Sequence, residues 1–184
     1  MEEQKPKKIL AELRQFFPAL AFVLKFVGLY VIGNIAYGLM VEYFDPNPDP
    51  VTELVARNTA SLLTLTGYPT ESIPQLNNPN VLLRWNERAV LAVYEGCNGL
   101  NVMIVFLAFL LAIGPYKKKI WLFSSIGLLG IHLLNLARIY GLFMVAVYLP
   151  HQFYFVHKYF FTAILYVLIF LLWILWFRIS GIRK

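Results

Sequence analysis

Apolar residues in this chain gather in long stretches with few charges, and polar or proline-containing segments separate these stretches. A membrane-spanning helix needs about 20 mostly apolar residues to cross roughly 30 Å of hydrocarbon. Four stretches approach this length and predict transmembrane helices at 17–40, 98–115, 120–138 and 159–177. Composition agrees, because 59% of the 184 residues are hydrophobic and only 14% are charged. The sequence therefore predicts an all-α integral membrane protein with one membrane-embedded domain over residues 1–184.

Basic residues cluster beside these stretches and predict the orientation of the chain. They lie in residues 1–16, in the short turn 116–119 and in the tail 178–184. Cytoplasmic segments carry an excess of lysine and arginine, so we expect all three segments, and both termini, in the cytoplasm. The first apolar stretch is too long for a signal-peptide core, so we expect it to be retained. Because the net charge of +6 comes from these clusters, we expect no nucleic-acid partner.

The connection 41–97 then lies outside the membrane and forms a small cap. It begins with alternating prolines, which exclude a regular helix. Val51–Thr66 follows and predicts a loosely amphipathic helix, which we expect along the membrane interface. After the breaker-rich Pro69–Asn80, the runs Val81–Trp85 and Ala89–Tyr94 favour a β-hairpin.

A second outer connection, 139–158, begins with an apolar segment that no simple span explains. Residues 139–150 continue past the depth at which the third span should end. Two interpretations fit this pattern: a re-entrant or interfacial helix, or a strongly tilted third span. The sequence does not decide between them.

Candidate chemistry is confined to one membrane depth. Cys97 is the single cysteine, which excludes an intrachain disulfide and a cysteine-rich metal site, so it is either inert packing or a nucleophile. A helix that begins at Ile120 reaches Arg138 after about 28 Å, close to the outer face. Cys97 and His157 each lie just before a span that runs inward from that face. A thiol, an imidazole and a guanidinium together suit acyl transfer, as nucleophile, proton carrier and stabilising cation.

Other histidines compete with His157 for this role. His151 lies in the same outer connection, and His132 lies about one and a half turns deeper than Arg138. Three histidines raise the question of a haem or metal, but they lack a pattern of carboxylate partners, so we expect neither a metal nor another cofactor.

Two other function classes fit the composition. A non-catalytic assembly or scaffold subunit of a secretion or polysaccharide system would use the polar cluster only to pack helices. A small transporter would use Arg138 to bind an anionic solute, but the polar residues collect at one face and no polar path crosses the spans. The common depth of nucleophile, base and cation favours an enzyme.

The local sequences add a family resemblance. Glu95–Gly99, with the sequence EGCNG, resembles the E-x-C-S-G box of the exosortase/archaeosortase family, and Asn135–Arg138 resembles its N-x-x-R box. His157 opens the final span as the family histidine does. The likeness extends from about Val81 to the C-terminus, and the short chain is similar to the compact exosortase F subgroup. Asn98 stands where the commonest pattern has serine, although an amide also donates hydrogen bonds.

This resemblance implies a cysteine peptidase or transpeptidase in the bacterial inner membrane, with its active site at the periplasmic face. Its substrates would be exported proteins with a C-terminal sorting signal, consisting of a short motif, a transmembrane segment and a basic tail. Cys97 would be the nucleophile, Arg138 would stabilise the thiolate or oxyanion, and His157 would be the general acid/base. The supporting residues are Glu95, Asn98, Gly99 and Asn135.

The resemblance leaves two points open. The thioacyl enzyme passes its acyl group either to water or to an amine on a glycan or lipid, and no residue decides which. Glu95 is either a charge at the membrane interface or the group that orients His157 or Arg138.

Overall fold

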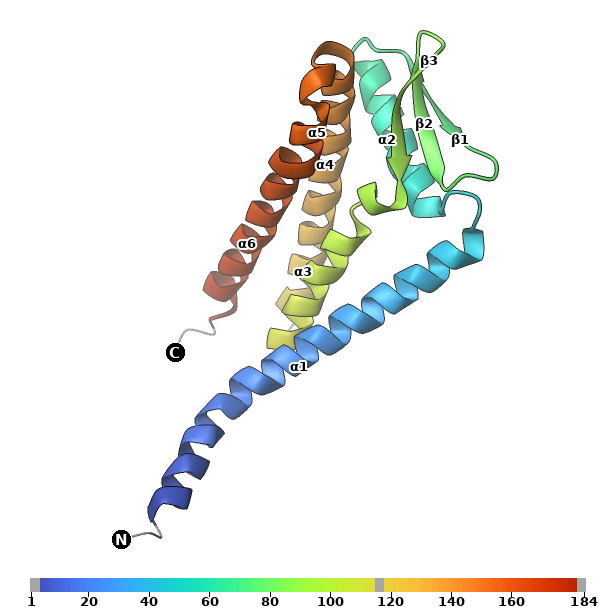
Figure 1. Ribbon diagram of the computed structural model, residues 1–184. Coiled ribbons are helices and arrows are strands. Elements are labelled where there is room, and N and C mark those ends of the chain that lie inside the picture. Colours follow the sequence, from blue (N-terminus) through green and yellow to red (C-terminus); the bar gives the residue numbers. More distant parts are fainter. Residues whose placement is uncertain (1–3, 115–117, 182–184) are drawn as a thin grey trace.

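The computed structural model describes residues 4–114 and 118–181. In this part of the chain, apolar helices form a bundle, and one helix with a small sheet forms a cap at one end of it (Figure 1). The bundle contains α1 (Gln4–Phe44), α3 (Leu100–Ile113), α4 (Lys118–Tyr148) and α6 (Phe161–Ser180). The cap contains α2 (Pro50–Leu65), β1 (Thr70–Pro74), β2 (Asn80–Trp85) and β3 (Arg88–Tyr94). Short turns complete the path: η1 (Glu95–Cys97), η2 (Pro150–Gln152), α5 (Phe153–Phe155) and the π-helical η3 (Val156–Phe160).

The helices confirm the predicted membrane class. Three described segments are long and apolar enough to cross a membrane: Phe16–Phe44, Lys118–Tyr148 and Pro150–Ser180. The remaining predicted span corresponds to α3, which has 14 residues and is about 21 Å long. The structure thus has three long spans and one shorter apolar helix. Part of the predicted turn 116–119 and of the tail 178–184 lies outside the described residues.

Helix α2 confirms the helix predicted at Val51–Thr66. Asp49 caps its first turn, because Oδ1 accepts hydrogen bonds from the backbone N–H groups of Val51 and Thr52, at 2.9 and 3.0 Å. The apolar face of α2 is fully buried at Val55 and Leu63. This face packs against the sheet and α4. Leu54, Leu62 and Leu65 are exposed, so the expected position of α2 along the membrane interface stays a prediction.

The predicted hairpin is also confirmed, and the structure adds a strand. β2 and β3 pair in antiparallel fashion around Asn86 and Glu87, whose φ angles of 49° and 62° are both positive, as a tight two-residue hairpin turn requires. β1, which lies within the segment expected to be breaker-rich, pairs with β2 and gives the sheet order β1-β2-β3. Its edge position tolerates Pro74, which a central strand would not.

The apolar segment after Arg138 continues α4. No break separates residues 139–148 from the rest of this helix, which rules out a separate re-entrant or interfacial helix there. Ile139 and Phe143 are buried in the cap core beside Val55, Leu63 and other residues of α2, β2 and β3. With 31 residues, α4 is about 46 Å long and exceeds the hydrocarbon thickness. Its last turns are therefore apolar because they complete the cap core.

A second core lies at the other end of the bundle. This core contains Phe106 and Leu110 of α3, Ile120, Phe123 and Ile131 of α4, and Trp176 of α6. Trp176 is only 1% exposed. By contrast, the most apolar window of the span in α1 has no buried residue. One side of α1 contacts α3, where Phe22 and Phe26 meet Phe109, and the rest of this helix is exposed, as expected in lipid. Cys97 packs against the cap core.

Candidate active site

Cys97 and His157 meet where the cap joins the bundle. Cys97 ends η1, the turn that connects β3 to α3, and His157 lies in η3 just before α6. The Cys97 Sγ and His157 Nε2 atoms are 3.8 Å apart, which is within hydrogen-bonding distance for sulfur. Short π-helical turns such as η3 frequently occur at functional sites, because they redirect one side chain within a helix. A predicted nucleophile and a predicted proton carrier, 60 residues apart, are thus neighbours.

Asn135 fixes the backbone of Cys97. This fully buried asparagine on α4 donates a hydrogen bond of 2.9 Å from Nδ2 to the Cys97 carbonyl oxygen. Gly99 makes room for it, because a Cβ at Gly99 would lie 3.2 Å from the Asn135 Cγ atom. Gly99 also has a φ of +85°, a conformation that glycine adopts without strain.

Arg138 lies one turn beyond Asn135 and carries a buried, poorly compensated charge. The residue is 9% exposed. Its Nη1 atom donates a long hydrogen bond of 3.5 Å to Asn135 Oδ1, and its Nε atom has no partner within the described residues. A buried cation normally requires an anionic partner. Asn135 connects this buried cation to the cysteine segment, since the same side chain bonds to both Arg138 and the Cys97 carbonyl.

Asn98 connects the cysteine segment to three helices. Its Nδ2 atom donates to the hydroxyl oxygens of Tyr37 on α1 (2.9 Å) and Thr52 on α2 (3.2 Å). Its Oδ1 atom accepts from the backbone N–H of Leu100, the first residue of α3 (2.9 Å). A serine could not make all three bonds, because a hydroxyl has a single donor. The amide at this position therefore has a structural function in this chain.

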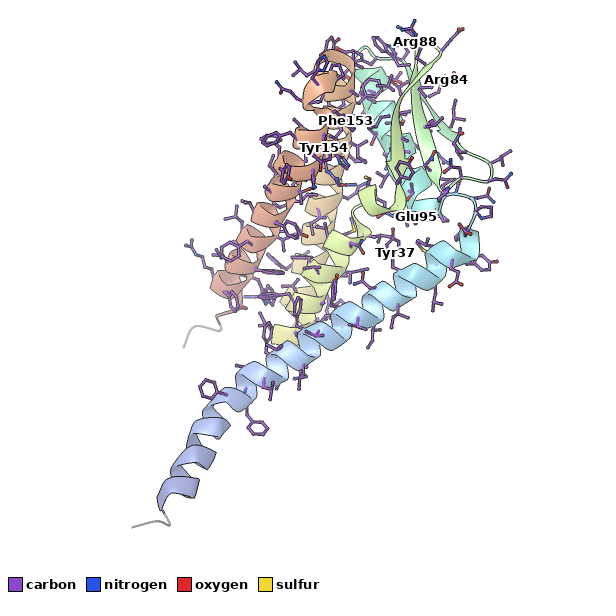
Figure 2. The ribbon with its side chains drawn as sticks, in the orientation of Figure 1. Tyr37, Arg84, Arg88, Glu95, Phe153 and Tyr154 are labelled. Atoms are coloured by element: carbon purple, nitrogen blue, oxygen red, sulfur yellow. The ribbon has the colours of Figure 1, made fainter. Side chains whose placement is uncertain are left out.

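Tyr37 is a member of the site that the sequence did not indicate. Its hydroxyl donates to the backbone carbonyl of Glu95 at 3.0 Å and accepts from Asn98, so it binds the residues on both sides of Cys97 (Figure 2). The available signal was weak: a tyrosine within an apolar span needs a partner for its hydroxyl. Nothing in the spacing shows that this partner is 58 residues away.

The Glu95 side chain faces other acids. Burial raises its pKa above the ordinary value, and the charges of Asp49 and Asp45 raise it further. Among the described residues, its carboxylate has no hydrogen bond or ion pair with His157 or Arg138. The backbone of Glu95, rather than its carboxylate, is the part that contacts the site.

The other two histidines lie elsewhere. His151 is exposed in η2, and the Nε2 atom of His132 is 3.5 Å from Asn58 Nδ2 on α2. In the described part of the chain, no three residues among the histidines, cysteine and acids are grouped to hold a metal ion. Of the three histidines, only His157 contacts Cys97 in the described structure.

A cavity of about 170 Å³ opens beside the cysteine. Its lining comes from β3, η1, α4, α5 and η3: Leu91, Ala92, Val93, Tyr94, Cys97, Ile139, Leu142, Phe153 and His157. The Phe153 ring stacks on the His157 imidazole, with 5.8 Å between ring centroids and 7° between ring planes. Figure 2 shows Phe153 on the helical side of the molecule, across from the strands. The cysteine–histidine pair thus borders an apolar space suited to a substrate side chain.

Comparison with known proteins identifies the family of the chain. The family model described as "Transmembrane exosortase" matches residues 13–175, nearly the whole chain. The chain belongs to the transmembrane exosortase family. As an exosortase it is a multi-pass membrane enzyme that processes sorting signals, and its substrates are proteins with C-terminal sorting signals. Exosortases are generally transpeptidase-like. No curated protein and no solved structure matched the chain.

Proposed function

We propose that this exosortase cleaves the sorting signal through a thioacyl intermediate on Cys97. The observation that carries the proposal is the 3.8 Å contact between Cys97 Sγ and His157 Nε2, beside a buried arginine without a carboxylate partner among the described residues. A thiol, an adjacent base and a third group that favours negative charge are the components of cysteine-based acyl transfer. The single cysteine of the chain leaves no other thiol for this role.

Acylation begins when His157 accepts the thiol proton. The resulting thiolate attacks the scissile carbonyl carbon, and the charge of Arg138 favours both the thiolate and the oxyanion that follows. The C–N bond then breaks, and His157 transfers its proton to the leaving amine. The substrate's N-terminal part remains bound to Cys97 as a thioester.

Deacylation reverses these proton transfers. The acceptor is water or an amine on a glycan or lipid, and His157 removes its proton as it attacks the thioester carbonyl. The thiolate leaves and takes this proton back from His157, which restores the site. Asn135, Asn98 and Gly99 support both steps, because they position the cysteine segment against α1, α2 and α4.

The charge pattern supports a topology for this reaction. We place both termini on the cytoplasmic side and the cap, with Cys97 at its base, on the periplasmic side of a bacterial inner membrane. Within the family, we assign the chain to the compact exosortase F subgroup as part of this proposal. A membrane-impermeant maleimide tests this orientation, because Cys97 is the only residue it can label: labelling only from the cytoplasmic side would reverse our assignment.

Processing of a reporter tests the catalytic roles. The reporter is a tagged protein that ends in the sorting signal of an exported protein from the same cell. We expect three variants to remain in the membrane and to process the reporter more slowly: Cys97→Ala, Arg138→Ala and His157→Ala. His157→Ala, which loses the general acid/base, should lower the rate by at least about 100-fold. Arg138→Lys should retain part of the rate, since it keeps the charge and loses the planar guanidinium.

Two exposed residues provide matched controls. His151→Ala and Arg178→Ala should process the reporter at the wild-type rate, because both side chains are exposed and neither contacts Cys97 in the described structure. Normal processing by Cys97→Ala would refute the proposal and would favour a non-catalytic role for the polar cluster.

A further inference from the structure

β3 has a free edge that faces the cysteine–histidine pair. In the sheet order β1-β2-β3, this strand has only β2 as a neighbour. Within the described residues, the backbone of 88–94 forms no hydrogen bond outside that pairing. Every second residue of an edge strand turns its N–H and C=O groups away from its neighbour. The edge therefore offers unpaired donors and acceptors to an additional strand.

The cavity beside Cys97 lies along this edge. Successive side chains of a strand point to opposite faces of the sheet. Four consecutive residues of β3, from Leu91 to Tyr94, nevertheless line the same cavity, which supports a cavity that borders the edge of the strand. Phe153 and His157 form the opposite wall. An extended peptide between these walls would meet β3 on one side and Phe153 and His157 on the other, with Cys97 just beyond the end of β3.

The size and lining of the cavity indicate one apolar side chain. The lining is apolar except for Cys97, His157 and the hydroxyl of Tyr94. Its volume of about 170 Å³ is close to that of an apolar cavity of about 150 Å³ that binds benzene. The space thus suits a single side chain up to about the size of a phenyl ring.

The direction of such a peptide follows from the topology. β3 runs toward Cys97 and continues through η1 into α3. In the substrate the order is the same, since the motif of a C-terminal sorting signal precedes its transmembrane segment. A substrate that enters the membrane next to α3 therefore runs parallel to β3.

The bundle offers space for that next segment. An apolar groove of about 410 Å³ lies between α3 and α6, lined by Val105, Tyr166, Val167, Ile169, Phe170 and Trp173. Val105 follows Cys97, and Tyr166 follows His157, by about two helical turns each. The cavity lies between β3 and α5, and the groove lies between α3 and α6, the helices that follow them. The groove therefore extends the space beside Cys97 farther into the bundle.

We propose that the sorting motif binds as an extended strand parallel to β3, with one apolar side chain in the cavity beside the scissile bond. This proposal rests on the thioacyl function above, because it assigns the substrate's path to Cys97. Strand addition supplies main-chain hydrogen bonds for affinity, and the cavity supplies selectivity.

Disulfide crosslinking in membranes tests the path. The full-length enzyme carries Cys97→Ser together with either Ala92→Cys or Tyr94→Cys, two residues that share one face of β3. The reporter carries one cysteine, moved through consecutive positions of its motif. Each enzyme variant should crosslink at alternate reporter positions, because only these share its face. Moving the enzyme cysteine from Ala92 to Tyr94 should shift the crosslinked position by two residues toward the reporter's C-terminus.

A matched variant and two outcomes make the test decisive. Ser72→Cys lies on β1, the opposite edge strand of the sheet, and should not crosslink. Crosslinks without two-residue periodicity, a shift toward the reporter's N-terminus, or crosslinking by Ser72→Cys alone would overturn parallel addition to β3. The thioacyl function fails separately, if Cys97→Ala processes the reporter while the crosslinking pattern is as expected.

Discussion

Gly99→Ala is the smallest change expected to disturb the catalytic cysteine without touching it. Gly99 has a φ of +85° at the start of α3. An added Cβ would lie 3.2 Å from Cγ and 3.3 Å from Nδ2 of Asn135, the side chain that holds the Cys97 carbonyl. The methyl group therefore acts twice, through the backbone of its own residue and through Asn135.

The size of both effects follows from this geometry. A residue with a Cβ costs about 1–2 kcal/mol in the left-handed region relative to glycine. The Asn135 amide must also move by a few tenths of an ångström, which weakens its bond to Cys97 and its bond from Arg138. A loss of 1.36 kcal/mol of transition-state stabilisation lowers a reaction rate tenfold, so we expect the processing rate to fall about tenfold. The unfolding temperature in mild detergent should fall as well.

Gly96→Ala is the matched control. Gly96 lies in the same five-residue box and has no positive φ, and a methyl group added there would meet no neighbouring atom within 4 Å. Reporter processing should be close to wild type in this variant and about tenfold lower in Gly99→Ala. Equal rates for wild type and Gly99→Ala would show that Asn135 does not position Cys97, and equal losses in both variants would show that any methyl in the box is harmful.

Three further changes test separate contacts. Tyr37→Phe removes a hydroxyl that bonds to Glu95 and Asn98, on either side of Cys97. Each buried group left unpaired costs about 1–3 kcal/mol, so processing should fall roughly tenfold. Tyr43→Phe, at an exposed position of the same helix, should process the reporter normally. The folded state raises the pKa of Glu95 above its ordinary value of 4.5, so the protonated side chain favours folding at low pH and this stabilisation is lost as the pH rises and the carboxylate forms. Glutamine stays neutral, so the unfolding temperature of Glu95→Gln should match that of the wild type near pH 4 and exceed it at pH 7. Gly127→Ala places a methyl 2.3 Å from an aromatic ring atom and should destabilise the bundle by about 1–3 kcal/mol, whereas Gly130→Ala, with open space, should not.

The local patterns predicted much of this fold. Apolar length indicated the helices of the bundle, and the apolar runs on either side of Asn86 and Glu87 indicated the hairpin, because these features depend on neighbours in sequence. β1 was missed because five residues beside prolines carry a weak strand signal, and its pairing with β2 creates most of its stability. The end of α4 was ambiguous because apolar residues that face lipid and apolar residues that face a cap core have the same composition.

The sequence likewise predicted only part of the candidate site. Depth alone grouped Cys97, Arg138 and His157, but only the fold brings two of them to 3.8 Å. Tyr37 could not be identified, since its two bonds cross from α1 to residues far along the chain. The role of Asn98 also depends on three helices that meet around it, so the amide in place of serine has no explanation in the sequence alone.

Detection of the thioester is the most direct test of catalysis by Cys97. The measurement incubates membranes containing the enzyme with the tagged reporter, stops the reaction in acid, and examines the enzyme by mass spectrometry. We expect a hydroxylamine-sensitive adduct between Cys97 and the N-terminal fragment of the reporter, which is absent from Cys97→Ala. Continued processing of the reporter by Cys97→Ala, with no adduct on the wild-type enzyme, would contradict a thioacyl mechanism.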